Sequence, residues 1–262
     1  MSVLEYTFDA NTGIASVELN RPDVLNALDR EMAELFREAV SDMARQNGLR
    51  CVVLTGAGRA FMAGGDVSGF ADEKVRREEL FNALLDAMNP AIVALRNLNA
   101  PILTGVHGVV AGAGLSLALM SDVVLSAPNT RFLIAYDRIG AVPDCGASWF
   151  LPRKVGMGRA ARLMMLSESL TTSQALAWGI VSEISKGDHF DASLNAMARK
   201  LAAGPGHSYG AFRRLTDQSF GGDLAAHLET ERAAFLDVSL TDDFAEGVAA
   251  FLGKRAANFT GC

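Results

Sequence analysis

Two glycine-rich segments, each directly after an apolar strand pattern, constrain the fold of this chain more than any other feature. Residues 50–55 have the pattern of a buried strand, and the glycine-rich segment 58–66 follows them. Residues 101–106 have the same pattern, and the glycine-rich segment 107–115 follows. Glycine permits tight turns and close backbone contact. Two such loops can aim two backbone N–H groups at one point, and that arrangement stabilises an oxyanion.

Strand, loop and helix patterns alternate along the first half of the chain. Residues 3–8 and 14–19 are typical of a hairpin around the turn at Gly13. Asp29 is a candidate N-cap for a helix that reaches about residue 46, and a second helix is expected over 73–98 with an interruption at Pro90. Further strands are expected over 122–127 and 130–134, and short helical segments from residue 159 onward. This order favours an α/β fold whose site lies beyond the carboxyl ends of parallel strands.

The C-terminal part of the chain is predicted to be helical throughout. A break at Gly204, Pro205 and Gly206 precedes its last three helical patterns. We therefore expect a core domain over 1–203 and a helical oligomerisation region over 204–262.

Composition narrows the class of protein. The chain has 262 residues, half of them hydrophobic, and a net charge of −6. An acidic chain of this kind is not expected to bind nucleic acid or an anionic membrane as its main partner. Its three cysteines form no disulfide framework, and no signal peptide or membrane-spanning pattern is visible, so a cytoplasmic location is expected. No cluster of residues has the spacing of a metal site.

The glycine segments have other interpretations when each is taken singly. They can serve only as tight turns after strands. A phosphate-binding loop is disfavoured because neither segment ends in Gly-Lys-Ser or Gly-Lys-Thr, and the spacing of a dinucleotide-binding loop is absent.

Further short motifs follow one another along nearly the whole chain. They are LNRP at 19–22, LNAL at 25–28, AFMAGGD at 60–66, the glycine-rich segment 108–117, WGIV at 178–181 and AFLGKR at 250–255. In this order they resemble the crotonase (enoyl-CoA hydratase/isomerase) superfamily. The resemblance implies a spiral of ββα units with a helical C-terminal trimerisation region, a homotrimer or a dimer of trimers, and an acyl-CoA substrate. It implies no separate cofactor, because CoA is part of the substrate.

The same resemblance implies roles for particular residues. The N–H groups of Gly65 and Ala113 should hold the oxygen of a thioester enolate. Asp66 also has a structural interpretation, as a hydrogen-bonding residue within its own loop. The implied substrate- and CoA-binding residues are Asp23, Val24, Leu25, Phe61, Ala63, Gly64, Asp66, Gly112 and Tyr136, with Phe251 and Lys254 reaching CoA in a neighbouring subunit.

The residues at two further positions indicate which reaction is carried out. Hydratases of this superfamily activate water with two glutamates, and the corresponding positions here are Ser116 and Tyr136. A serine is not a base near neutral pH without a partner group. A tyrosine is a weak base, since its pKa is about 10. Asp144 occupies the position of the essential carboxylate in several isomerases of the superfamily. One carboxylate beside an enolate can move a proton between two carbons, so isomerisation is expected. Alternatively, Asp144 is the N-cap of a helix that begins near Gly146.

The expected substrate remains open between two kinds of acyl group. Segments 132–151 and 246–261 resemble the ring-epoxide isomerases, which convert an epoxyphenylacetyl-CoA to an oxepin-CoA, and this resemblance also implies Δ3-to-Δ2 enoyl-CoA isomerisation. The alternatives are a hydratase of unusual mechanism and an inactive acyl-CoA-binding paralogue. Dehalogenation is disfavoured because the tryptophan and histidine of such enzymes correspond to Tyr136 and about Asn89. His107 is expected to be a structural histidine.

Overall fold

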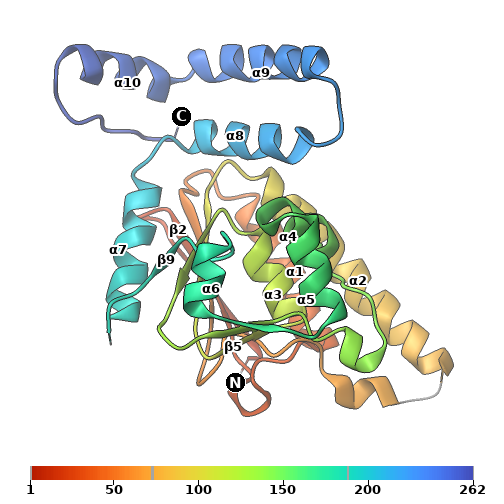
Figure 1. Cartoon of the computed structure of the whole chain (residues 1–262). Coiled ribbons are helices and arrows are strands. Elements are labelled where there is room, and N and C mark those ends of the chain that lie inside the picture. Colours follow the sequence, from red (N-terminus) through yellow and green to blue (C-terminus); the bar gives the residue numbers. More distant parts are fainter. Residues whose placement is uncertain (1, 72–73, 188, 262) are drawn as a thin grey trace.

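Two sheets and a surrounding set of helices make up the fold (Figure 1). The computed structural model describes residues 2–71, 74–187 and 189–261. The larger sheet has the strand order β1-β2-β3-β4-β6-β9 and the smaller one the order β5-β7-β8. The strands are β1 (Leu4–Asp9), β2 (Ile14–Leu19), β3 (Cys51–Gly56), β4 (Ile102–Val106), β5 (Val109–Ala111), β6 (Val123–Ser126), β7 (Arg131–Leu133), β8 (Ser169–Thr171) and β9 (Glu183–Ile184).

Helices cover these sheets and form the C-terminal region. The α-helices are α1 (Arg30–Met43), α2 (Lys74–Asn97), α3 (Ala113–Met120), α4 (Ala147–Val155), α5 (Met157–Met165), α6 (Thr172–Ala177), α7 (Phe190–Ala202), α8 (Gly206–Gln218), α9 (Leu224–Ser239) and α10 (Asp242–Leu252). Short 3-10 helices are η1 (Pro22–Val24), η2 (Val67–Ala71) and η3 (Asp137–Ile139). Among the described helices, none is long and apolar enough to cross a membrane.

The larger sheet has the predicted mixture of hairpin and parallel strands. β1 pairs with β2 in an antiparallel register that places Leu4 opposite Leu19, and β2, β3, β4, β6 and β9 then run parallel. β3 and β4 are almost entirely buried, as expected of parallel strands with both faces covered. Both glycine-rich segments therefore leave the sheet at the carboxyl ends of adjacent strands.

The first two helices differ from the sequence prediction in detail. Asp29 is the N-cap of α1, since its carboxylate accepts the N–H of Met32 at 2.9 Å, but α1 ends at Met43, short of residue 46. The expected interruption of α2 was wrong, because the helix continues through Pro90 to Asn97. The predicted first residue of α2, residue 73, lies outside the described residues. The strands β5, β8 and β9 were not predicted, since each has only two or three residues.

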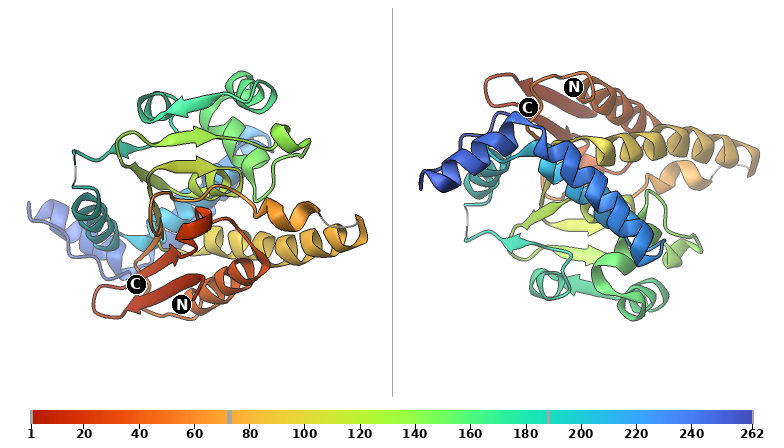
Figure 2. Two further views of the ribbon diagram at one scale, coloured as in Figure 1. Left: turned by 90° about the horizontal axis from the view of Figure 1, so that it is seen from below. Right: turned by 90° about the horizontal axis from the view of Figure 1, so that it is seen from above.

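Helices α8, α9 and α10 form a layer at one end of the core (Figures 1 and 2). Arg50, next to β3, holds this layer through its guanidinium group, which donates to the carbonyls of Ala202, Gly204 and Phe259 at 2.8 to 3.1 Å. The α/β core and the helical C-terminal region agree with the fold class predicted from the sequence. The exact division at residues 203 and 204 stays a prediction.

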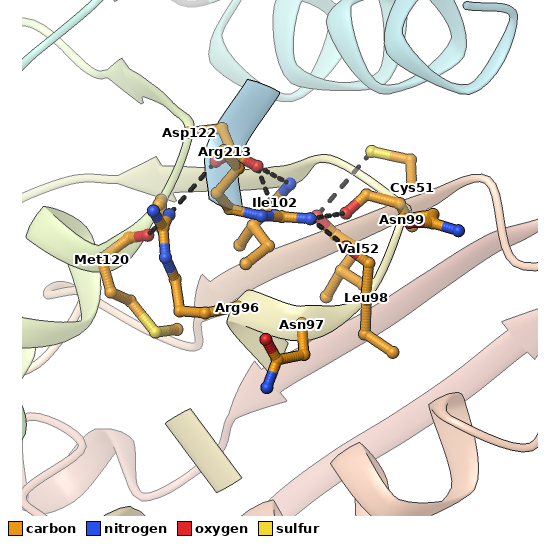
Figure 3. Close-up of polar contacts among 12 residues, drawn as sticks. Cys51, Val52, Arg96, Asn97, Leu98, Asn99, Ile102, Met120, Asp122 and Arg213 are labelled. Atoms are coloured by element: carbon orange, nitrogen blue, oxygen red, sulfur yellow. Dashed lines mark hydrogen bonds and ion pairs between the residues drawn. The ribbon is translucent and has the colours of Figure 1, made fainter. Parts of the chain in front are cut away.

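A cluster of ion pairs around the buried Arg213 joins α8 to the larger sheet. Figure 3 shows Asp122 between the guanidinium groups of Arg96 and Arg213, at 3.2 and 2.7 Å. Arg213 is only 2% exposed and also donates to the carbonyls of Leu98 and Ala100. The Asp122 carboxylate accepts the N–H of Ile102 at 2.8 Å. One carboxylate therefore joins the end of α2, the start of β4 and the C-terminal layer.

We predict that Asp122→Asn destabilises the protein by about 3 kcal/mol, because it leaves the buried Arg213 without its counter-charge, whereas Arg96 keeps its ion pair with Asp217 at 2.7 Å. Urea unfolding at one fixed protein concentration measures this. The matched control is Glu34→Gln, which removes the same kind of charge from the exposed Arg30–Glu34 pair and should change stability little. Equal urea concentrations at the unfolding midpoints of the two variants would contradict the stabilising role of Asp122.

Candidate active site

The two glycine-rich segments lie side by side and are joined by backbone hydrogen bonds. The N–H of Phe61 donates to the carbonyl of His107 at 2.9 Å, and the N–H of Met62 donates to that of Val109 at 3.2 Å. In return, the N–H of Ala111 donates to the carbonyl of Met62 at 2.8 Å. The segments therefore meet as the sequence predicts, and their pairing fixes the position of one loop relative to the other.

This contact leaves no room for side chains at its closest points. A Cβ on Gly114 would lie 2.6 Å from the carbonyl oxygen of Met62, and one on Gly112 would lie 3.1 Å from the Cα of Gly64. Gly64 and Gly112 also have φ values of +112° and +50°, which side chains rarely adopt. These glycines are thus required for the approach of the two loops.

The N–H groups of Gly65 and Ala113 lie at this junction, and both residues line a cavity of about 740 Å³. Hydrogen bonds fix both peptide groups that flank Gly65. The carbonyl of Gly64 accepts the N–H of Leu28, and the N–H of Asp66 donates to the carbonyl of Leu28. Within the described part of the chain, neither the Gly65 nor the Ala113 N–H has a hydrogen-bond partner. Two backbone donors are therefore available to a ligand in the cavity.

Ala113 is the first residue of α3, and its φ is not positive, so its methyl group causes no backbone strain. The first N–H groups of a helix have no partner inside the helix, and its N-terminus carries a partial positive charge. Both properties favour a negatively charged oxygen at this end of α3.

Asp144 lines the same cavity from the loop before α4. Its Oδ1 accepts the hydroxyl of Tyr136 at 2.5 Å, and its backbone carbonyl accepts the hydroxyl of Ser116 at 3.0 Å. The alternative role as a helix N-cap is wrong, because Gly146 occupies that position and no side chain caps α4. The carboxylate of Asp144 therefore belongs to the cavity.

The walls of the cavity are mainly apolar. Phe70 and Phe81 meet edge to face with ring centroids 4.8 Å apart, and Leu85 and Ile139 lie nearby on the lining. Asn89 adds one amide. Among the described lining residues, Asp144 is the only carboxylate. Sequence reasoning missed the Phe70, Phe81 and Leu85 wall, because their apolar pattern does not distinguish a cavity wall from ordinary core.

Asp66 has the structural role and does not line the cavity. Its carboxylate accepts the hydroxyl of Ser68 at 2.5 Å and pairs with the guanidinium of Arg21 at 3.0 Å. The hydrogen bond from Ser68, followed by that from Arg21, lowers the pKa of Asp66. Asp66 therefore holds its loop, as its structural interpretation predicts, and its contact with substrate or CoA stays a prediction.

The remaining predicted contacts fall in three groups. Ala63, Gly64, Gly112 and Tyr136 line the cavity, whereas Asp23, Val24 and Leu25 lie in or next to η1, outside its lining. The expected contact of Phe61 with CoA is wrong, because its side chain is fully buried in the core. Phe251 and Lys254 lie at the exposed end of the C-terminal layer, and their contact with a neighbouring subunit stays a prediction.

His107 is a structural histidine, as predicted. Its Nε2 lies 3.0 Å from the carbonyl oxygen of Gly58, and its ring packs against Phe190. It thus helps to hold the first glycine-rich segment.

Residues 9–262 match the family described as enoyl-CoA hydratase/isomerase. The chain belongs to this family. It is 34% identical over 250 residues to the 1,2-epoxyphenylacetyl-CoA isomerase of Escherichia coli K12, covering 95% of each chain. It is 36% identical to a probable enoyl-CoA hydratase of Rhodobacter capsulatus over the full length of both. A solved enoyl-CoA hydratase/isomerase structure from Mycobacterium abscessus has a TM-score of 0.91 at 28% identity, covering 99% of this chain and 100% of that one.

Membership of the enoyl-CoA hydratase/isomerase family gives the junction of the two loops a chemical meaning. An acyl-CoA thioester is the kind of substrate consistent with this family. A thioester oxygen that becomes negatively charged needs donors that are already in place, and the two loops offer two N–H groups on one cavity.

We predict that Ala113→Pro lowers kcat by about 100- to 1000-fold, because it removes one oxyanion donor. Proline is well accepted at the first position of a helix, so α3 should still form. The matched control is Met157→Pro, which places proline at the exposed first position of α5. Steady-state turnover and circular dichroism of both variants test this. Full activity in folded Ala113→Pro would exclude the Ala113 N–H as a donor.

Proposed function

We propose that this enzyme is an acyl-CoA isomerase in which Asp144 transfers the proton and the N–H groups of Gly65 and Ala113 hold the enolate oxygen. The observation that carries the proposal is that Asp144 is the only carboxylate among the described lining residues of a cavity that holds both N–H groups. The name of the E. coli relative, an epoxyphenylacetyl-CoA isomerase, supports the same class of reaction.

The proposed reaction on a 3-enoyl-CoA needs no group beyond these. Asp144 removes a proton from C2, and the electron pair delocalises onto the thioester oxygen, where Gly65 and Ala113 donate hydrogen bonds. The enolate then takes the same proton back at C4, and the double bond moves from C3–C4 to C2–C3. One carboxylate acts first as base and then as acid, so the net charge of the site is restored.

The cavity also supports a ring-bearing acyl group. Its Phe70–Phe81 pair gives a broad apolar wall against which a ring can pack. A volume of about 740 Å³ lies within the range of small-molecule sites. We therefore propose 2-(1,2-epoxy-1,2-dihydrophenyl)acetyl-CoA and linear 3-enoyl-CoA thioesters as the two substrates to test.

Hydration is the second candidate function, because the R. capsulatus relative is named a probable enoyl-CoA hydratase. Activation of water in the usual way needs carboxylates where this chain has Ser116 and Tyr136. Burial, followed by the nearby charge of Asp144, raises the pKa of the Tyr136 hydroxyl, so that hydroxyl stays protonated and is not a base. These residues favour isomerisation over hydration.

We also propose that the enzyme assembles as a homotrimer or a dimer of trimers through α8–α10. Large apolar side chains on these helices are exposed in the single chain, as is the neighbouring loop residue Phe220. Exposed apolar surface of this extent is typical of a protein interface. The residues are Phe212, Phe220, Leu224, Leu228, Phe235, Leu236, Leu240, Val248, Phe251 and Leu252.

We predict that Asp144→Asn lowers kcat for 3-enoyl-CoA isomerisation by 100-fold or more, since an amide does not accept the substrate proton. CoA binding should survive. The assay follows formation of the conjugated 2-enoyl thioester, and calorimetry with CoA measures binding. Asp223→Asn is the matched control, because this N-cap lies on α9 and asparagine is an equally good cap.

Two results would count against this assignment. Full isomerase activity in Asp144→Asn would exclude Asp144 as the proton carrier. Rapid hydration of crotonyl-CoA by the wild-type enzyme would favour the hydratase instead.

The assembly predicts a solution mass of three or six times the 27.8 kDa chain. Light scattering coupled to size-exclusion chromatography measures it. Phe235→Asp places a charge on an exposed apolar position of α9 and should shift the mass toward the monomer. A monomeric wild-type protein would contradict the proposed assembly.

A further inference from the structure

A hydrogen bond holds one oxygen of the Asp144 carboxylate in the cavity. The Tyr136 hydroxyl lies 2.5 Å from its Oδ1, which is a short hydrogen bond of the charge-assisted kind. Tyr136 is only 9% exposed, so little water competes for this contact. One of the two carboxylate oxygens is therefore occupied before any substrate binds.

Tyr136 is itself held by its surroundings. Its backbone carbonyl accepts the N–H groups of Ile139 and Ala141 at 3.2 and 3.0 Å, which closes the turn at η3. From α3, the Ser116 hydroxyl lies 3.3 Å from the Tyr136 hydroxyl and 3.0 Å from the backbone carbonyl of Asp144. Residues from α3, from the turn at η3 and from the loop before α4 thus meet at the Tyr136–Asp144 pair.

The Tyr136 hydroxyl is the donor of its hydrogen bond to Asp144. Burial raises the pKa of the Tyr136 hydroxyl, and the nearby Asp144 charge raises it further, so the phenol keeps its proton and donates it. Burial also raises the pKa of the Cys145 thiol, with Asp144 again adding to the effect, so Cys145 stays neutral. The phenol of Tyr136 is therefore the donor of this hydrogen bond and the Asp144 carboxylate is the acceptor.

We propose that Tyr136 is a positioning residue that occupies Oδ1 of Asp144 and so makes Oδ2 the oxygen that moves the substrate proton. This inference rests on the proposed isomerase function. Proton transfer between two carbons of one substrate needs the same oxygen to reach both, and a fixed carboxylate does so without searching for its orientation. Tyr136 acts through Asp144 and has no proton to exchange with the substrate itself.

The chain offers a matched control for this proposal. Tyr6 donates to the Oδ2 of Asp42 at 2.8 Å, so a second tyrosine–aspartate hydrogen bond lies between β1 and α1. Tyr6→Phe and Tyr136→Phe remove the same hydroxyl from the same kind of pair. Only the second pair lines the cavity.

The experiment measures kcat and KM for 3-enoyl-CoA in wild type, Tyr136→Phe, Tyr6→Phe and Asp144→Asn. We expect Tyr136→Phe to lower kcat by about 10- to 100-fold with KM changed less than about 2-fold, because binding contacts remain while the carboxylate loses its orientation. Tyr6→Phe should match wild type in kcat. Wild-type kcat in Tyr136→Phe would overturn the proposal.

A crystal structure of Tyr136→Phe gives a readout that does not depend on activity. We expect the Asp144 carboxylate to leave its single orientation once the hydroxyl is absent. An unchanged orientation would overturn the positioning role even if wild-type turnover were undetectable. By contrast, an inactive wild type, or an active Asp144→Asn, would count against the isomerase function alone, so the two failures are distinguishable.

Discussion

The pairing of two glycine-rich loops is the constraint on which the rest of the site depends. Hydrogen bonds between Met62 and its partners Val109 and Ala111 join the loops, and the approach is possible because Gly112 and Gly114 have no side chains. Each loop leaves the carboxyl end of its own parallel strand, so the larger sheet sets their spacing. The N–H groups of Gly65 and Ala113 owe their common cavity to this pairing. A larger residue at either glycine would separate the two donors before it changed any catalytic side chain.

Backbone donors have a particular advantage at such a site. They carry no net charge, they do not titrate, and they are fixed by the fold, so they stabilise a developing negative charge without rearrangement. The choice of reaction then falls to the side chains that surround them. In this cavity those side chains are mostly apolar, with Asp144 as the single carboxylate among the described lining residues. In the proposed function, the loops supply the donors for an enolate oxygen, and the residues around Asp144 select the reaction.

Much of this arrangement follows from local sequence patterns, and the parts that do not have physical reasons. The long apolar strands, the Asp29 cap and the two loops are encoded within a few neighbouring residues, and they were predicted. The continuation of α2 through Pro90 was not, because packing along the whole helix outweighs one lost hydrogen bond. Short strands such as β8 and β9 depend on distant partners. The Tyr136–Asp144 contact joins residues eight positions apart, and the shape of η3 and the loop after it, which the sequence does not reveal, brings them together.

This site has hydroxyls, on Ser116 and Tyr136, at the two positions where a hydratase of the usual kind needs carboxylates. The two hydroxyls lie beside Asp144. A carboxylate at the position of Tyr136 would add a second negative charge near Asp144 and would compete with it for protons. A phenol whose pKa is raised by burial instead donates to Asp144 and never competes with it. Ser116 likewise donates to the backbone of Asp144 and carries no charge. The two hydroxyls therefore hold one carboxylate in place without adding a second one. A cavity organised in this way is suited to returning a proton to its own substrate, because it has no further carboxylate with which to activate water.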